Sequence, residues 1–406
     1  MNRRNFLCTA LAGAGARLAH ASLPKTKITH IRYYKSPTDA ASRPNTHQPL
    51  FNQSSNVVLI ETDAGLTGIG EGGAHDTMEQ CAGMLIGEDP FRIERLWHTM
   101  ARSYFYPAGR ERLHALGALD MALWDLKGKA LGVPLYEMLG GLTREYVECY
   151  STGFPRQGDE KETARACVEF GFRAYRTQLG GGKIFDRFDE VRRTFEHCQR
   201  IREGVGKDGA WAIDYHTRVD FPDAVALSNM IEPLRPYFVE DLVRSENPGV
   251  YRTLRGQVKV PIAVGEQYGN RWDMNELIEQ HLIDYARVTV PNAGGPTEYI
   301  KIANLCETHQ VGLIPHFTGP ISEAALVHLC GTFSGPVLME MLGKGAQKWP
   351  YLTQGYEFRA GKLWPNSRPG IGVEVDTKQL QMILEVSERY APLPMISRPD
   401  GSLTNW

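Results

Sequence analysis

Three carboxylates in the middle of the chain recur at one constant spacing. Asp214, Glu240 and Glu266 are 26 residues apart, and each follows a short apolar run, in WAID, YFVE and IAVGE. A strand and its following helix occupy roughly 20–30 residues, so the spacing predicts three successive parallel strands that each end in an acid. Converging carboxylates are the hard oxygen ligands that Mg²⁺ prefers. The pattern therefore predicts a Mg²⁺ site, although one such acid alone would more simply begin a loop or cap a helix.

Two histidines occupy positions where they could assist a metal ion. His216 lies two residues after Asp214, and alternate residues of a strand share a face, so its imidazole is expected beside the metal. His316 ends the apolar run VGLIPHF and is expected to face the same pocket. A supporting or loop position is the alternative for His216, because histidine suits either role.

Other charged and polar residues end further apolar runs. Arg176 and Gln178 end FRAYRTQ, and Glu340 ends GPVLME. Gln178 is expected to bind the substrate. Arg176 is always charged, so it is a poor base by itself and is expected to stabilise an anion, with a surface ion pair as the alternative. Glu340 is expected to contact substrate hydroxyls or to hold a histidine, and a buried structural carboxylate is the alternative. Asp241 should point to the opposite face of a regular strand from Glu240, which excludes it from the predicted metal site.

Strand and helix patterns alternate from Tyr146 onward. Such alternation is typical of an α/β fold with a parallel sheet, and eight units predict closure into a (β/α)₈ TIM-type barrel. The eight candidate strands are VECYSTG, FRAYRTQ, AWAIDYH, PYFVEDL, PIAVGEQ, YARVTV, VGLIPHF and GPVLME.

A smaller α+β capping domain is predicted before the barrel. KITHIRYYK is a predicted strand, and SSNVVLIETDAGLTGIGEGG contains two strands joined by a turn. Three helical patterns follow, and the polar loop between residues 35 and 56 is long enough to be a lid over the site. The predicted domains are residues 22–145 for the cap, 146–365 for the barrel, and 366–406 for a segment that returns to the cap.

The first 21 residues have the features of an export signal. Arg3 and Arg4 precede Phe6 and a stretch of small and apolar residues, and Ala19-His20-Ala21 is a possible cleavage site. This pattern resembles a twin-arginine signal peptide and predicts a mature chain in a bacterial periplasm. A disordered or amphipathic N-terminus is the alternative.

Charge and cysteine content exclude several classes of function. The 406-residue chain has a formal net charge of −2, so it lacks the basic footprint of a nucleic-acid-binding protein. Its seven cysteines show no CxxC spacing, which argues against a zinc site or a redox pair. No apolar run after the signal reaches the roughly 18 residues that a membrane span requires.

Several separated motifs together resemble the enolase superfamily over nearly the whole mature chain. They are the three spaced acids, the helix ALGALDMALWDLKGKALGVPLYEMLGG and the late RPGIGVEVD. DYH, VTVPNAGGPTEYIKIANLCE, PHFTGP and LME are most similar to the mannonate and galactonate dehydratase-like branch, of the mandelate racemase/muconate lactonizing enzyme type. The resemblance implies a divalent-metal lyase that removes water from a sugar acid, with His216 as the acid that protonates the leaving β-hydroxyl. It also suggests a homo-oligomer.

Two positions depart from the superfamily pattern, and they leave the general base open. Where the resemblance implies an aspartate paired with His316, this chain has Thr289, so a hydrogen-bonding or electrophilic role is the alternative to a strong base for His316. Arg176-Thr177-Gln178 replaces a lysine pair and is similar to the Arg-x-Gln of mannonate dehydratases, in which a tyrosine from the next loop assists the arginine. No tyrosine lies between Tyr175 and Tyr215 here. His316 and Lys183 are the remaining candidates, and Lys183 is more simply a solvated loop residue.

These observations predict a Mg²⁺-dependent sugar-acid dehydratase. Removing the proton next to a carboxylate creates an enediolate, whose charge must be stabilised where it develops, and loss of the β-hydroxyl then gives a 2-keto-3-deoxy acid. An epimerase, racemase or cycloisomerase could use the same enediolate without losing water. A periplasmic sugar-acid binding protein that has lost its base is the alternative outside the enzymes.

Overall fold

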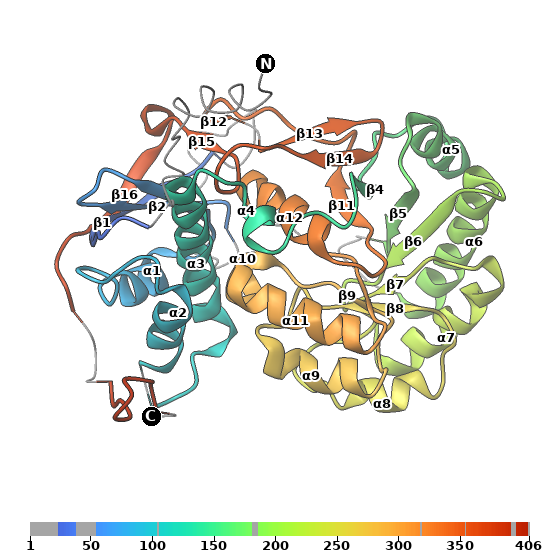
Figure 1. Ribbon diagram of the computed structural model, residues 1–406. Coiled ribbons are helices and arrows are strands. Elements are labelled where there is room, and N and C mark those ends of the chain that lie inside the picture. Colours follow the sequence, from blue (N-terminus) through green and yellow to red (C-terminus); the bar gives the residue numbers. More distant parts are fainter. Residues whose placement is uncertain are drawn as a thin grey trace, which may run out of the picture.

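The computed structural model describes residues 23–37, 54–103, 105–180, 186–316, 319–353, 355–390 and 395–404. The predicted export signal, most of the predicted lid and Lys183 lie outside these residues. Figure 1 shows a sheet with its helices at the left and a strand-and-helix barrel at the right.

The eight strands predicted for the barrel are confirmed. Neighbours from β4 to β10 pair in parallel in sequence order, and β11 pairs in parallel with β4. A parallel bridge between Leu313 of β10 and Val337, just before β11, closes the ring. The strands are β4 (Val147–Thr152), β5 (Ala174–Gln178), β6 (Ala210–Asp214), β7 (Val239–Glu240), β8 (Ile262–Val264), β9 (Tyr285–Ala286), β10 (Gly312–Leu313) and β11 (Met339–Leu342).

Helices cover the outside of the barrel (Figure 1). Asp159 caps the start of the first of them, because its side chain accepts a hydrogen bond from the backbone N–H of Glu162, and Gly171 caps its end in the left-handed conformation with φ 116°. The helices are α5 (Glu160–Phe170), α6 (Arg187–Val205), α7 (Phe221–Ile231), α8 (Val250–Arg255), α9 (Arg271–Glu279), α11 (Pro296–Thr308) and α12 (Pro320–Thr332), with a 3₁₀ turn at Glu232–Leu234. The short α10 (Val290–Ala293) packs instead against the cap, where Pro291 lies close to Gly117.

The barrel interior is packed rather than open. Inward-facing side chains from successive strands form one buried apolar cluster. This cluster lies beneath the charged residues at the strand ends and fills the interior of the barrel. Its buried members are Tyr150, Ala174, Ala212, Phe238, Ala263, Ile314 and Leu338.

The capping domain is a four-stranded antiparallel sheet packed on helices. Its strand order is β16-β1-β2-β3, so the segment Gln381–Val386 near the end of the chain pairs with the first strand (Figure 1). The long helix α3 lies so close to β3 that a Cβ added at Gly70 would stand 2.0 Å from the Ala118 carbonyl oxygen. The elements are β1 (Ile28–Lys35), β2 (Val57–Thr62), β3 (Thr67–Glu71), β16 (Gln381–Val386), α1 (His75–Ala82), α2 (Ile93–Arg102) and α3 (Gly109–Leu131).

Short elements connect the two parts. β14 pairs with β4 and so continues the barrel sheet, and β12 pairs with β15 in a separate ribbon. These elements are α4 (Leu135–Met138), β12 (Leu352–Thr353), β13 (Tyr356–Arg359), β14 (Lys362–Pro365), β15 (Glu374–Val375) and a 3₁₀ turn at Thr377–Gln379.

Two polar residues of the cap contact the segments that follow barrel strands. The carboxylate of Glu71, at the end of β3, accepts a 2.6 Å hydrogen bond from the backbone N–H of Ile321 at the start of α12. Arg110 of α3 donates to Asp273 Oδ2 at 2.9 Å and to Ser245 Oγ at 2.7 Å. The cap therefore lies against the C-terminal ends of the barrel strands, where the candidate site is located.

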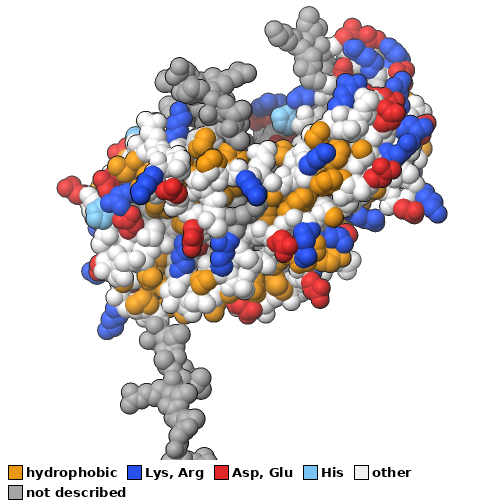
Figure 2. All heavy atoms as spheres, turned by 90° about the horizontal axis from the view of Figure 1, so that it is seen from above, with side chains coloured by type: hydrophobic (Ala, Val, Ile, Leu, Met, Phe, Trp, Pro, Cys, Tyr) orange, Lys and Arg blue, Asp and Glu red, His pale blue; other side chains and the backbone are white. Residues whose placement is uncertain are grey.

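The distribution of charge on the surface agrees with the nearly equal numbers of acidic and basic residues in the sequence. Figure 2 shows acidic and basic side chains interspersed on the face that it presents. Within the described part of the chain, no helix combines the length and the apolar character needed to cross a bilayer. The six cysteines in that part are all buried free thiols.

Candidate active site

The three spaced carboxylates lie side by side at the C-terminal ends of neighbouring strands. Asp214 ends β6 and is in register with Glu240, which ends β7. Glu266 follows β8 by two residues. The side chains of Asp214 and Glu240 are fully buried, and that of Glu266 is 13% exposed. The constant spacing in the sequence thus becomes a compact acidic group at one end of the barrel.

Arg176 extends from β5 into this acidic group. Its guanidinium donates to Glu240 Oε2 at 2.9 Å, to Thr152 Oγ1 at 3.1 Å and to Asp214 Oδ2. Burial opposes the charge of Arg176, but Glu240, Glu340 and Asp214 outweigh it and raise the arginine pKa. Arg176 is therefore a permanent cation, which suits anion stabilisation and not proton abstraction.

Arg287, one residue past β9, is a site residue that our sequence analysis missed. It is fully buried and donates to Glu240 Oε1, to Glu340 Oε2 at 2.6 Å and to the Tyr150 hydroxyl at 2.7 Å. Its guanidinium is also 3.5 Å from Glu266 Oε2. The available signal was a charged residue in the middle of the apolar strand pattern YARVTV.

Glu340, in β11, is held as an anion. The Thr152 hydroxyl donates to Glu340 Oε1 at 2.6 Å, and Arg287 binds the other carboxylate oxygen. Burial opposes its ionisation, but Arg287 and Arg176 prevail and lower the pKa of Glu340 to about 2. Its partners in the structure are thus arginines and a threonine, and the expected contacts with substrate hydroxyls or with a histidine stay predictions.

The two candidate histidines flank Glu266. His216 Nε2 lies 3.9 Å from Glu266 Oε1, and His316 Nε2 lies 3.6 Å from Glu266 Oε2. His316 Nδ1 forms a 2.8 Å hydrogen bond with Thr289 Oγ1, in the position where the superfamily resemblance implies an aspartate. Burial lowers the pKa of His316, against the opposing effect of Glu266. With one imidazole near each oxygen of Glu266, the two histidines could transfer protons at two different positions of a bound substrate.

His216 reaches Glu266 by a different backbone path from the one predicted. It does not continue β6, because His216 and Thr217 have φ angles of 50° and 54°, in the left-handed region. The Asp214 carboxylate accepts a 2.6 Å hydrogen bond from the His216 backbone N–H and so fixes this turn. A turn held by Asp214, and not strand alternation, places the imidazole at the mouth of the barrel.

Our expectation that Asp241 points away from the acidic group was wrong. Asp241 has a φ of 44°, so the strand loses its regular alternation at that residue. Oxygen atoms of Glu240, Asp241 and Glu266 all lie within 4.8 Å of one another. Burial, followed by the charges of Glu266 and Asp214, raises the pKa of Asp241 well above its usual value.

The donor set fits a hard divalent cation. Five carboxylates, those of Asp214, Glu240, Asp241, Glu266 and Glu340, converge here on two guanidinium groups, so the site holds three more negative than positive charges when all five are ionised. Buried carboxylates in such excess require a counter-charge, and carboxylate oxygen is the ligand that Mg²⁺, Mn²⁺ and Ca²⁺ prefer.

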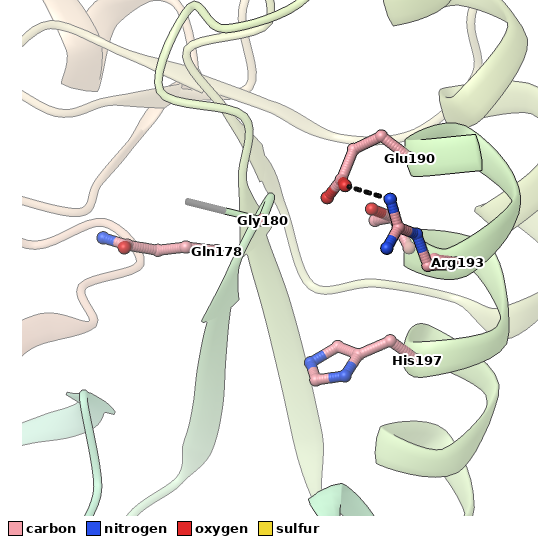
Figure 3. A pocket seen from close by; sticks show the side chains of 6 residues that line it. Gln178, Gly180, Glu190, Arg193 and His197 are labelled. Atoms are coloured by element: carbon pink, nitrogen blue, oxygen red, sulfur yellow. Dashed lines mark ion pairs between the residues drawn. The ribbon is translucent and has the colours of Figure 1, made fainter. Parts of the chain in front are cut away.

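Gln178 stands at the rim of the site. It is exposed at the end of β5, two residues beyond Arg176, and its side chain points away from α6 (Figure 3). A small polar pocket lies behind it, lined by Gln178, Gly180, Glu190, Arg193, Thr194 and His197. Arg193 pairs with Glu190, one turn away on α6, at 3.6 Å along one wall of this pocket. Because no predicted metal ligand lines it, this pocket is separate from the acidic site.

Replacing Thr289 by aspartate is expected to raise the pKa of His316 by about one to three pH units, because a charged acceptor at Nδ1 stabilises the imidazolium. The protonated form would then persist to higher pH than in the natural chain. NMR titration of labelled histidines measures the change. Thr289→Asn is the matched control, since it accepts a hydrogen bond without a charge, and equal pKa values in the two variants would contradict the prediction.

Comparison with known proteins places the chain in a family. Residues 35–140 match the mandelate racemase/muconate lactonizing enzyme N-terminal domain, and residues 159–379 match the enolase C-terminal domain-like family. The D-galactonate dehydratase of Pectobacterium atrosepticum is 35% identical over 368 residues, covering 86% of this chain and 95% of that protein.

Solved structures agree with this placement. A member of the enolase superfamily from Salmonella Typhimurium is 27% identical with a TM-score of 0.79, covering 89% of this chain and 100% of that one. The 3,6-anhydro-D-galactonate cycloisomerase of Zobellia galactanivorans is 28% identical with a TM-score of 0.75, covering 87% and 98%. With its cap, its closed barrel and its acidic strand ends, the chain belongs to the mandelate racemase/muconate lactonizing enzyme group of the enolase superfamily.

Proposed function

We propose that this protein is a Mg²⁺-dependent sugar-acid dehydratase, a carbon–oxygen lyase that converts an aldonic acid into a 2-keto-3-deoxy acid. The observation that carries the proposal is the pair of imidazoles on either side of Glu266, within a group of carboxylates that fits a divalent cation. The D-galactonate dehydratase relative supports the reaction class.

The proposed metal ligands are Asp214, Glu240 and Glu266. A bound Mg²⁺ would supply positive charge where negative charge develops on the substrate carboxylate. Arg176 and Arg287 add fixed positive charge beside these ligands, and the rim residue Gln178 and the anionic Glu340 are proposed to contact substrate hydroxyls.

His316 is the proposed base. If the Thr289 hydroxyl accepts the hydrogen bond from Nδ1–H, the lone pair on Nε2 faces the site and can take the proton α to the substrate carboxylate. Burial, which lowers the pKa of His316, keeps the imidazole neutral and ready to accept that proton. Lys183 was the other candidate, and it lies outside the described residues.

His216 is the proposed acid. Its imidazole lies across Glu266 from His316, so it can protonate the β-hydroxyl as the β-carbon–oxygen bond breaks and water leaves. The α-carbon–hydrogen bond is broken by His316, and the enol that remains tautomerises to the 2-keto acid. The two histidines thus divide the proton transfers of one elimination.

A cycloisomerase or epimerase is the second candidate. The structural similarity to the 3,6-anhydro-D-galactonate cycloisomerase favours it, because both reactions begin with loss of the same α-proton. A screen of sugar acids with Mg²⁺ in D₂O, beginning with D-galactonate and followed by NMR, tests the two together. Keto acid supports dehydration, deuterium exchange without keto acid supports the alternative, and binding without either supports a binding protein.

Replacing His216 by asparagine is expected to lower keto-acid formation by about 10²- to 10⁴-fold, the usual effect of removing a general acid, while α-proton exchange in D₂O survives. Asparagine tolerates the left-handed backbone of this position. His281→Asn is a matched control, because His281 is exposed and has a φ of 51°. Equal losses of exchange and of keto acid in His216→Asn would contradict the assignment of His216 as the acid.

We also propose export to the periplasm by the twin-arginine route and assembly as a homo-oligomer. Arg3 and Arg4 with the following apolar stretch support the first, and the superfamily membership supports the second.

A further inference from the structure

Asp241 differs from the other carboxylates of the site in its electrostatic environment. Asp214, Glu240, Glu266 and Glu340 are each in an ion pair with Arg176 or Arg287. Within the ranges that the structure describes, Asp241 is in no ion pair, and its side chain has one hydrogen bond, from Gln267 Nε2 at 3.4 Å. Yet Asp241 is only 2% exposed. A carboxylate buried to this extent without a cation is costly, so Asp241 must either hold a proton or lie beside a positive charge.

The backbone holds the Asp241 side chain toward the metal ligands. The Asp241 N–H donates to the Ala263 carbonyl at 3.2 Å, and its own carbonyl accepts from Thr217 N–H at 2.9 Å. Both neighbouring strand ends thus hold the left-handed residue in place. Its carboxylate oxygen then lies within 4.8 Å of those of Glu240 and Glu266, the distance range over which one ion can bind several carboxylates.

We infer that Asp241 is a further direct ligand of the metal ion, beyond the three ligands at 26-residue spacing, an inference that rests on the proposed metal-dependent function. The ion would supply the positive charge that Asp241 lacks. The alternative is that Asp241 supports the site from behind through Gln267, as a positioning residue that never contacts the ion.

Counting the water molecules on a bound Mn²⁺ ion distinguishes these roles. Mn²⁺ is a paramagnetic probe for the Mg²⁺ site, and the full chain is used. Free Mn²⁺ is followed by electron paramagnetic resonance to obtain Kd, and water-proton relaxation gives the number of waters on the bound ion. Loss of a direct ligand opens a coordination position to water, whereas loss of a positioning residue leaves the number of waters unchanged.

For Asp241→Asn we expect Kd for Mn²⁺ to rise by about tenfold or more and the bound ion to gain one water. Asp241→Gly, which removes the side chain and is compatible with φ 44°, is expected to behave in the same way if the asparagine variant folds poorly. Asp208→Asn is the matched control, since Asp208 is exposed near the opposite end of β6 and should change neither quantity. An unchanged water number in both Asp241 variants, with or without weaker binding, would overturn the inference.

Keto-acid formation by the wild-type chain is measured in parallel to separate two kinds of failure. If the wild type forms keto acid and binds Mn²⁺ while the Asp241 variants keep its water number, only the assignment of Asp241 fails. If the wild type binds no Mn²⁺ at millimolar concentration, both the assignment and the proposed metal-dependent function fail.

Discussion

Replacing Glu240 by glutamine is expected to reduce keto-acid formation by at least about 10³-fold, which corresponds to roughly 4 kcal/mol of lost transition-state stabilisation. Glu240 accepts hydrogen bonds from both Arg176 and Arg287, and it is one of the proposed metal ligands. A neutral amide has nearly the same shape but lacks the charge that these cations and the metal require. The loss is measured as kcat/KM with the best substrate of the screen.

Glu246→Gln is the matched control for this variant. Glu246 lies in the loop after the same strand and pairs with Arg244 on the surface, so the same change should leave the activity within about twofold of the wild type. Circular dichroism of both variants establishes that the fold is retained. An active Glu240→Gln enzyme with a wild-type Mn²⁺ affinity would remove Glu240 from the proposed site.

Replacing Arg287 by methionine is expected to lower the free energy of unfolding by about 3–5 kcal/mol. Arg287 is fully buried, and its guanidinium binds Glu240 and Glu340 and lies 3.5 Å from Glu266, so its removal leaves an excess of buried negative charge. Methionine fills much of the same volume, which isolates the effect of the charge. Urea unfolding of the metal-free chain, followed by fluorescence, measures the change.

Two further variants test the cause of this destabilisation. Arg252→Met removes an exposed arginine that pairs with Glu276, and it should cost only about 0–1 kcal/mol. Adding Glu340→Gln to Arg287→Met should recover part of the lost stability, because it removes one of the carboxylates left without a cation. Full wild-type stability of Arg287→Met would contradict the view that this arginine neutralises the centre of the site.

The sequence determined the barrel and the place of its acidic residues. Alternating strand and helix patterns predicted all eight barrel strands, because period and composition are local properties of each segment. The 26-residue spacing of Asp214, Glu240 and Glu266 placed them at one end of the barrel, since parallel strands of equal units end on the same face. Arg176 and Gln178 followed from the same reasoning, as neighbours of Asp214 on the adjacent strand.

The tertiary structure alone decided how the side chains meet. Arg287 pairs with Glu240 and Glu340, which are 47 and 53 residues away in sequence. A single charged residue in an apolar strand does not predict which distant residues it will contact. The orientations of His216 and Asp241 depend on left-handed backbone conformations that strand alternation does not predict. These conformations arise where successive strand ends hydrogen-bond to each other, so they follow from long-range pairing and not from the local sequence.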